Sequence, residues 1–146
     1  MIEDLATRGG GVVGHGVDLC EERRIAGMVE RHGERFLDRV FTAGEQEYAR
    51  SGGVLRVERL AARFAAKEAV LKALGTGWRG GIAWTDVEVC RDASGRPRVR
   101  LAGEAAAEAA RQGIESWHLS LTHASGLAIA SVLACGGGAV GDSMSP

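Results

Sequence analysis

The sequence lacks the features that mark membrane proteins, secreted proteins and general nucleic-acid binders. In its 146 residues no stretch approaches the roughly 18 consecutive apolar residues expected of a membrane span. Residues 1–10 contain acidic side chains and no apolar core, so we expect no signal peptide. The net charge of −1 argues against a nucleic-acid partner, which requires a broad basic surface. The length and composition instead predict one globular domain with no membrane partner.

Cysteine and lysine are also scarce. Cys20, Cys90 and Cys135 are odd in number and far apart, with no zinc-binding spacing, so we expect reduced thiols and a cytoplasmic location. Of the 18 basic residues, only Lys67 and Lys72 are lysine. Two lysines five positions apart in an arginine-rich chain suggest a need for a compact point charge, with chance clustering as the alternative.

The residue periodicities predict an α+β domain over residues 11–135, preceded by a disordered segment at 1–10 and followed by a flexible tail at 136–146. The longest predicted helix consists almost entirely of good helix formers and ends at Gly75. Thr42 and Glu45 fit a capping box at the start of another helix, and residues 92–95 form the expected turn of a β-hairpin. The expected strands are 12–20, 86–91, 98–101, 116–122 and 127–133, and the expected helices are 21–32, 43–50, 58–74 and 103–112.

The long helix carries both lysines. Lys67 falls within an apolar stripe, so its ammonium group must either extend to the surface or meet an anion. Glu68 and Lys72 are four positions apart on a neighbouring stripe, and this spacing alone favours a surface ion pair. The following Gly75-Thr76-Gly77 would let a phosphate approach the backbone, but a helix C-terminus repels anions. A phosphate there would depend on the nearby cations, Lys67, Lys72 and Arg79.

Three other positions are candidates for binding or catalysis. Asp18, near the end of the first strand, is either a helix cap or a Mg²⁺ ligand that pairs with Glu68 if the long helix packs beside this strand. His123 follows a strand, where it is either structural or a ligand contact. The first helix presents Arg24, Arg31 and, if Gly33 does not break the helix, Arg35 on one face, which suits either docking of an acidic partner or solvation.

Five segments, taken in order, resemble the bacterial holo-[acyl-carrier-protein] synthase family, the small trimeric 4′-phosphopantetheinyl transferases. They are GHGVDL (14–19), RVFTAGEQEYA (39–49), RFAAKEAVLKALGTG (63–77), DASGRPRV (92–99) and HLSLTHASGLAIASV (118–132). The resemblance implies an antiparallel sheet packed against a long helix, with subunits assembled as a homotrimer. It also implies transfer of 4′-phosphopantetheine from coenzyme A to a serine of apo acyl carrier protein, with release of adenosine 3′,5′-bisphosphate.

The resemblance assigns the chemistry to three residues. Asp18 and Glu68 match the family's Mg²⁺ ligands, and Lys72 matches the lysine proposed to assist phosphoryl transfer. In this reading Mg²⁺ neutralises the diphosphate and Lys72 stabilises charge on the leaving bisphosphate. Glu68, directly or through a water molecule, is the candidate for accepting the serine proton, a choice that the sequence leaves open.

The resemblance also implies binding residues. The positions matching the family's coenzyme A contacts are Arg63, Lys72, Gly75, Gly77 and His123. Arg24 and Arg31 match the basic helix that docks the carrier protein. Since Arg63 lies on a different helix face from Glu68, it is expected either to act within one chain or to reach coenzyme A bound mainly by a neighbouring subunit.

Two other functions stay open at this stage. One is a non-catalytic module that binds coenzyme A or a carrier protein, which the presence of both Asp18 and Glu68 disfavours. The other is a Mg²⁺-dependent hydrolase of nucleotide diphosphates, which would need no basic docking helix. The sequence does not distinguish a carrier protein of fatty-acid synthesis from one of polyketide synthesis.

Overall fold

The computed structural model describes residues 11–137 and has the α+β organisation that the sequence predicts. In chain order the elements are β1 (Val12–Glu21), α1 (Glu22–His32), α2 (Glu34–Val40), α3 (Ala43–Ser51), η2 (Gly53–Leu55), α4 (Arg56–Leu74), η3 (Trp84–Asp86), β2 (Val87–Arg91), β3 (Pro97–Leu101), α5 (Gly103–Arg111), β4 (Ile114–Ala124) and β5 (Leu127–Gly136). The predicted terminal segments, 1–10 and all but the start of 136–146, lie outside the described residues. No helix within residues 11–137 is long and apolar enough to cross a lipid bilayer.

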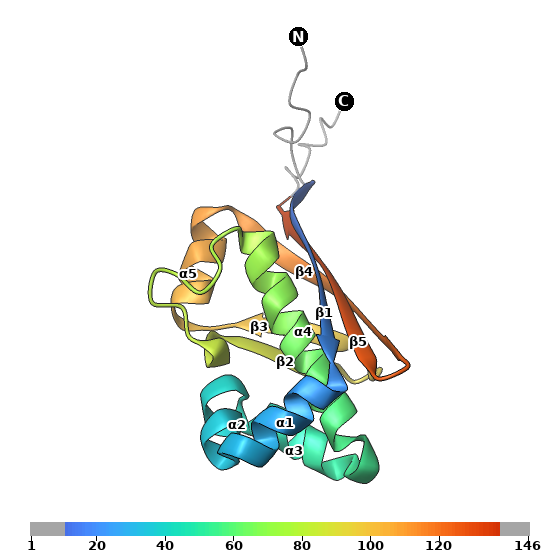
Figure 1. Ribbon diagram of the computed structural model, residues 1–146. Helices are drawn as coiled ribbons and strands as arrows, with labels where there is room; N and C mark the ends of the chain where they lie inside the picture. Colours follow the sequence, from blue (N-terminus) through green and yellow to red (C-terminus); the bar gives the residue numbers. More distant parts are fainter. Residues whose placement is uncertain (1–10, 138–146) are drawn as a thin grey trace, which may run out of the picture.

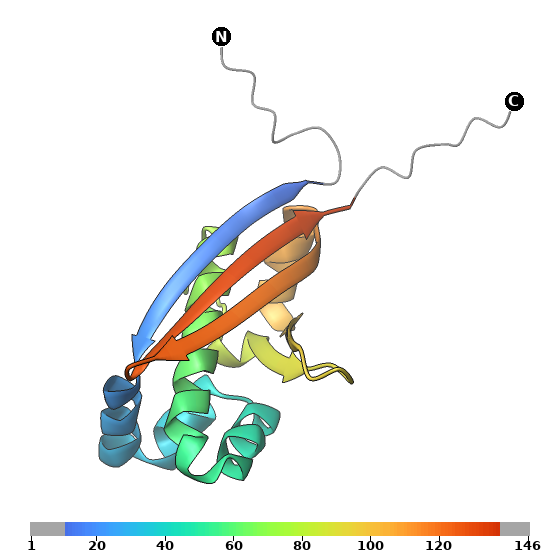
Figure 2. The same cartoon turned by 90° about the vertical axis from the view of Figure 1, so that its right-hand side faces the viewer.

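A three-stranded antiparallel sheet with the order β1-β5-β4 curves along one side of α4 (Figures 1 and 2). Its register pairs Asp18 of β1 with Ala130 of β5, and Ala130 with Leu121 of β4. The second sheet is the β2–β3 hairpin, which pairs around the predicted turn at 92–95. The strands therefore agree with the predicted positions, although β4 and β5 are longer than expected.

Helix α4 lies against β1 at a distance that only glycine permits. A Cβ at Gly16 would lie 1.8 Å from the carbonyl oxygen of Ala69, and one at Gly14 would lie 2.1 Å from that of Ala73. Because both contacts are with backbone atoms, no side-chain movement relieves them. The two glycines of the GHG segment therefore bring the end of β1, including Asp18, directly beside the middle of α4.

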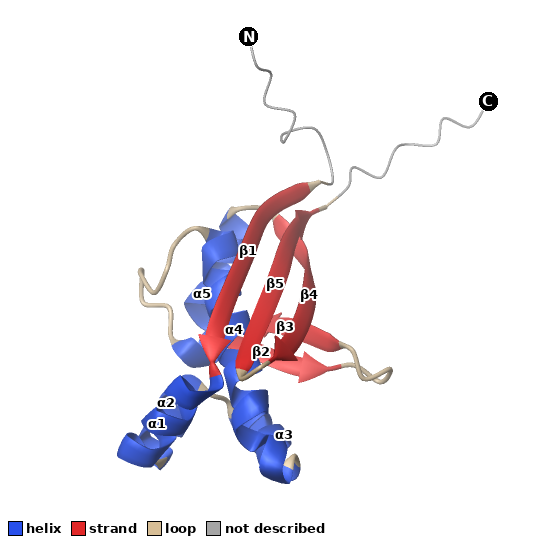
Figure 3. Cartoon of the chain, turned by 45° about the vertical axis from the view of Figure 1, so that its right-hand side comes forward, coloured by secondary structure: helices blue, strands red, loops and turns tan. Residues whose placement is uncertain are grey.

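Three short helices gather at one end of the molecule, around the start of α4 (Figure 3). The capping box predicted from Thr42 and Glu45 is present at the start of α3. Helix α2 is not among the predicted elements. Gly33, with φ of 53°, ends α1, and α2 then begins in a new direction that buries Phe36 and Val40. Arg35 therefore does not continue the face of Arg24 and Arg31.

Lys67 is a structural residue: of the two alternatives expected for its ammonium group, it meets an anion, and that anion is the Glu45 carboxylate rather than a phosphate. Its ammonium group is fully buried and lies 2.7 Å from Glu45, which is also fully buried. Lys67 further donates hydrogen bonds to the carbonyl oxygens of Trp84 and Val87. Glu45 accepts from the backbone N–H groups of Thr42 and Val89. Burial lowers the pKa of Lys67, and the Glu45 carboxylate opposes that effect. The pair joins α3, α4 and β2 in the core.

Replacing Lys67 by methionine should lower the free energy of unfolding by about 3–5 kcal/mol, because Glu45 would remain buried and unpaired. Lys72→Met is the matched control on the same helix, since the Lys72 side chain is 56% exposed, and should cost less than about 1 kcal/mol. Urea unfolding at one fixed protein concentration measures both values. Equal losses in the two variants would contradict a structural role for the buried pair.

The two faces of the three-stranded sheet differ. The face toward α4 is buried and carries small side chains, among them Ala128, Ala130 and Ala134. None of the helices within residues 11–137 covers the opposite face (Figure 2). This open sheet face exposes large apolar side chains, namely Val17 (45%), Leu19 (53%), Ile129 (37%) and Leu133 (37%). Such a contiguous apolar surface marks an interaction site.

Candidate functional site

Asp18 reaches the surface of α4 rather than capping the next helix. It lies on the face of β1 that also carries Gly14 and Gly16, and α1 has no side-chain cap at its N-terminus. Its Oδ1 atom lies 3.0 Å from Nζ of Lys72, which also donates to the carbonyl oxygen of Val17. This excludes the alternative of Asp18 as a helix cap.

The same contact corrects the surface ion pair expected between Glu68 and Lys72. The lysine extends to β1, and the salt bridge that it forms is with Asp18. Glu68 lies near Asp18 and forms no salt bridge with Lys72. Its pKa is raised, first by burial and second by the negative charge of Asp18, while Arg24 and Lys72 oppose the rise. We call Asp18, Glu68 and Lys72 the carboxylate cluster.

Cys20 is the next inward-facing residue of β1. Its side chain is buried, and burial raises the pKa of the thiol to about 11. At neutral pH the thiol is therefore protonated and a poor nucleophile or metal ligand. The candidate catalytic groups near the end of β1 are therefore the carboxylates of Asp18 and Glu68 and the ammonium group of Lys72.

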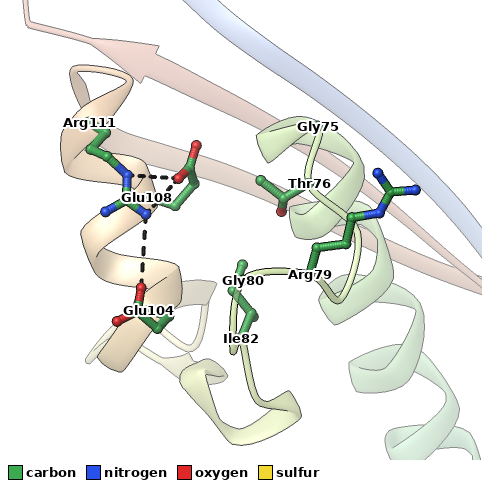
Figure 4. A pocket seen from close by; sticks show the side chains of 8 residues that line it. All are labelled: Gly75, Thr76, Arg79, Gly80, Ile82, Glu104, Glu108 and Arg111. Atoms are coloured by element: carbon green, nitrogen blue, oxygen red, sulfur yellow. Dashed lines mark hydrogen bonds and ion pairs between the residues drawn. The ribbon is translucent and has the colours of Figure 1, made fainter.

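The two predicted glycines lie where α4 ends. Gly75 caps the helix with φ of 74°, and Gly77 has φ of 57°, so both use a left-handed backbone that favours glycine. A cavity of about 180 Å³ lies between this loop and α5, and Figure 4 shows the side chains that line it. Its α5 wall carries Glu104 and Glu108, both paired with Arg111. The lining also includes Arg79, so two carboxylates stand against two guanidinium groups and the cavity has no excess positive charge that would favour a phosphate.

Arg63 and His123 lie together in a second, larger pocket of about 420 Å³. The Arg63 side chain is buried, with its guanidinium 4.0 Å from the ring centroid of Tyr48. Burial lowers the pKa of Arg63, and its Nε atom has no hydrogen-bond partner among residues 11–137. The Nε2 atom of His123 lies 3.2 Å from Oε1 of Glu58.

Sequence reasoning missed three residues of this pocket. Tyr48 stacks with Arg59 at 4.2 Å as well as with Arg63, and its hydroxyl accepts a hydrogen bond from Arg91. Arg59 precedes Arg63 by one turn of α4, which is a signal available in the sequence. Tyr48 and Arg91 come from α3 and β2, and nothing local links them. We call this site the arginine pocket, because three guanidinium groups surround one phenol ring and can attract an anion.

The structure thus divides the predicted residues into two separate groups within one chain. None of the described residues that line the arginine pocket belongs to the carboxylate cluster. Arg63 and Glu68 are five positions apart on α4, which places them about 140° apart around its axis. A ligand that contacts both groups must therefore bridge two chains or pass around the helix.

The two predicted docking residues differ in their surroundings. The Arg24 guanidinium lies 5.3 Å from the ring centroid of Phe64, on the side of α4 that carries Glu68. Arg31 is exposed and donates to the sulfur of Met28. Beside Arg31 a groove of about 300 Å³ runs between α1 and α2; this docking groove is lined by Met28, His32, Arg35, Phe36 and Arg39. It combines an apolar floor with basic walls, a combination that suits an acidic amphipathic helix.

Comparisons with known proteins give matches over most of the chain. A family model of the 4′-phosphopantetheinyl transferase superfamily matches residues 14–130. The holo-[acyl-carrier-protein] synthase of Koribacter versatilis is 48% identical over 122 residues, covering 84% of this chain and 97% of that protein. The enzyme of the same name from Gloeobacter violaceus is 49% identical over 121 residues, covering 83% and 91%.

Solved structures extend the likeness to three dimensions. The holo-[acyl-carrier-protein] synthase of Neisseria meningitidis has a TM-score of 0.77 at 32% identity, with 84% of this chain and 98% of that chain covered. The Helicobacter pylori synthase, solved in complex with coenzyme A, has a TM-score of 0.72 at 28% identity, with 82% and 98% covered. Both neighbours therefore match nearly all of the described fold.

Proposed function

The chain belongs to the 4′-phosphopantetheinyl transferase superfamily, and we propose that its carboxylate cluster and its arginine pocket together form the active site. It is a holo-[acyl-carrier-protein] synthase: it transfers 4′-phosphopantetheine from coenzyme A to a serine of apo acyl carrier protein and releases adenosine 3′,5′-bisphosphate. The α+β fold expected from the motifs is confirmed. The observation that carries the proposed site is the convergence of Asp18, Glu68 and Lys72 from β1 and α4.

The carboxylate cluster fits a magnesium ion. Asp18 and Glu68 present carboxylate oxygens close enough for the charge of one to raise the pKa of the other. Magnesium prefers oxygen ligands and commonly takes one or two protein carboxylates, with water and substrate phosphates completing its shell. We therefore assign Asp18 and Glu68 as the residues that would hold Mg²⁺. When bound, the ion would neutralise the diphosphate of coenzyme A.

The residues of the cluster have separate tasks. Lys72 orients Asp18 through their 3.0 Å contact, and its half-exposed ammonium group can stabilise negative charge on the leaving bisphosphate. Glu68, directly or through a water molecule, is the candidate for accepting the serine proton. The serine oxygen then forms its bond to the β-phosphorus as the bond to the bisphosphate breaks.

The arginine pocket supplies the positive charge that an anionic part of coenzyme A requires. Arg63 and His123, both expected to contact coenzyme A, are joined there by Arg59 and Arg91. Because the pocket and the carboxylate cluster are separate within one chain, we propose that a neighbouring subunit brings them together. The open sheet face, with Val17 and its exposed apolar neighbours, supports a homotrimer built around this surface.

The three free cysteines support the expected cytoplasmic location.

The transfer itself is tested by mass spectrometry. Purified protein, coenzyme A and Mg²⁺ are incubated with apo acyl carrier proteins from fatty-acid and polyketide synthesis, and each carrier protein is weighed. A gain equal to one phosphopantetheine group identifies the activity and the preferred carrier. Binding without any gain would favour the non-catalytic module, and hydrolysis of coenzyme A without a carrier protein would favour the diphosphate hydrolase.

Reversing the charge of Arg31 should raise the KM for the carrier protein by about tenfold or more and leave the KM for coenzyme A unchanged. Arg31→Glu removes an exposed positive charge beside the docking groove, and charge reversal at an interface costs on the order of 1–2 kcal/mol or more. Added salt should reproduce part of this loss in the unmodified protein. Steady-state kinetics with each substrate varied in turn gives both constants.

Two further variants serve as comparisons for Arg31→Glu. Arg96→Glu makes the same change of charge at the exposed turn between β2 and β3 and should leave both constants unchanged. Arg24→Glu places a carboxylate beside Glu68 and should therefore lower kcat as well. An unchanged carrier-protein KM in Arg31→Glu would make this face of α1 ordinary solvated surface.

A further inference from the structure

Trp78 lies on the loop that follows α4 and is held by an aromatic stack. Its ring centroid lies 3.7 Å from that of Trp84, which lies 5.0 Å from that of Phe64 on α4. Loop residues Gly77 and Gly80 flank Trp78 with positive φ angles, so the backbone around it is shaped by glycine. The stack gives a side chain on an irregular loop a defined position against the helix.

The polar atom of this side chain has no partner. The Trp78 Nε1 atom is buried and forms no hydrogen bond with any residue that the structure describes. Buried indole N–H groups usually have an acceptor, and leaving one unpaired costs about 1–3 kcal/mol. Glu68 is the acidic group that Trp78 affects: the indole N–H approaches its carboxyl group closely enough to lower the pKa of Glu68, but without the distance and angle of a formed hydrogen bond.

We propose that Trp78 is a positioning residue for Glu68, whose carboxylate accepts a hydrogen bond from the indole N–H when it holds a divalent cation. The inference rests on the proposed role of Asp18 and Glu68 in binding Mg²⁺. A carboxylate ligand that donates one oxygen to a cation keeps the other oxygen available for an outer partner. Such outer hydrogen bonds fix the orientation of metal ligands, and their loss typically costs 10–100-fold in affinity or activity.

Among the donors around Glu68, Trp78 is the one to which we assign this hydrogen bond. Lys72 is already bonded to Asp18 and to the backbone of Val17. Arg24 is stacked over Phe64 and affects Glu68 through its charge. Trp78 is thus the neighbouring donor whose N–H is buried without a partner among residues 11–137, and the stack on Trp84 keeps that donor from turning toward solvent.

The test compares two substitutions that remove the same chemical group. Trp78→Phe removes the N–H beside Glu68, whereas Trp84→Phe removes an N–H from the neighbouring ring of the same stack. Calorimetric titration of Mg²⁺ into protein with coenzyme A, in the absence of carrier protein, measures cation affinity without turnover. We expect Trp78→Phe to weaken Mg²⁺ binding about tenfold and Trp84→Phe to change it less than twofold. In the assay, Trp78→Phe should raise the Mg²⁺ concentration for half-maximal rate, with the KM for the carrier protein unchanged.

Two results of these titrations would contradict the proposed role of Trp78. Equal effects of Trp78→Phe and Trp84→Phe would overturn the positioning role and leave Trp78 as a packing residue. If Mg²⁺ binds Asp18→Ala as tightly as the unmodified protein, the cation site itself is wrong and the role of Trp78 falls with it. Should Trp78→Phe fail to fold, benzothienylalanine at position 78, which has sulfur in place of the N–H in a ring of nearly the same shape, replaces it in the same titration.

Discussion

Replacing Asp18 or Glu68 by alanine should lower the rate of phosphopantetheine transfer by about a thousandfold or more while the protein stays folded. The two carboxylates lie side by side at the end of β1 and on α4. Removing either one takes away a ligand for the ion that neutralises the diphosphate. A loss of roughly 4 kcal/mol in transition-state stabilisation corresponds to this factor. Single-turnover transfer to apo carrier protein, with circular dichroism as the check on folding, measures it.

The control for this prediction is Glu47→Ala, which removes an exposed carboxylate from α3 and should retain full activity. A chelator of divalent cations should abolish transfer by the unmodified protein, and added Mg²⁺ should restore it. Full activity of Asp18→Ala or of Glu68→Ala, or full activity in chelator, would reject the assignment of this cluster as the magnesium site.

Mixing two inactive variants should restore activity if the active site lies between subunits. Glu68→Ala removes the carboxylate cluster from a chain, and Arg63→Ala removes its arginine pocket. If each site combines one cluster with the pocket of the neighbouring chain, random exchange of subunits makes about one quarter of the sites intact. The equal mixture, incubated under conditions that exchange subunits, should therefore recover about a quarter of the normal rate. His123→Ala offers a second partner for Glu68→Ala, because its side chain is half exposed and less important for packing.

The matched control mixes Asp18→Ala with Glu68→Ala. These residues belong to one cluster within one chain, so no exchange of subunits restores both to the same site. Light scattering gives the oligomeric state independently. A stable monomer at the assay concentration would defeat the shared site, whereas a trimer without recovery would reject only the placement of Arg63 and Glu68 on different chains.

Local structure and family membership could be predicted from the amino-acid sequence. The capping box of Thr42 and Glu45 begins α3, and Gly75 ends α4, because these signals act within one turn of the chain. The alternation of apolar residues and the turn at 92–95 were sufficient for the β2–β3 hairpin. Helix α2 escaped prediction because seven residues after a glycine carry little periodic signal, and its formation depends on burying Phe36 against the core.

The partners of the charged residues could not be predicted, because they depend on how distant elements pack together. Spacing along α4 favoured Glu68 as the partner of Lys72, but the salt bridge forms with Asp18, 54 positions away, because Gly14 and Gly16 let β1 approach the helix. Lys67 likewise pairs with a residue distant in sequence, Glu45, because α3 packs against α4. A burial pattern indicates that a charge needs a partner, but it cannot name the partner, because long-range contacts arise only when separate elements pack together.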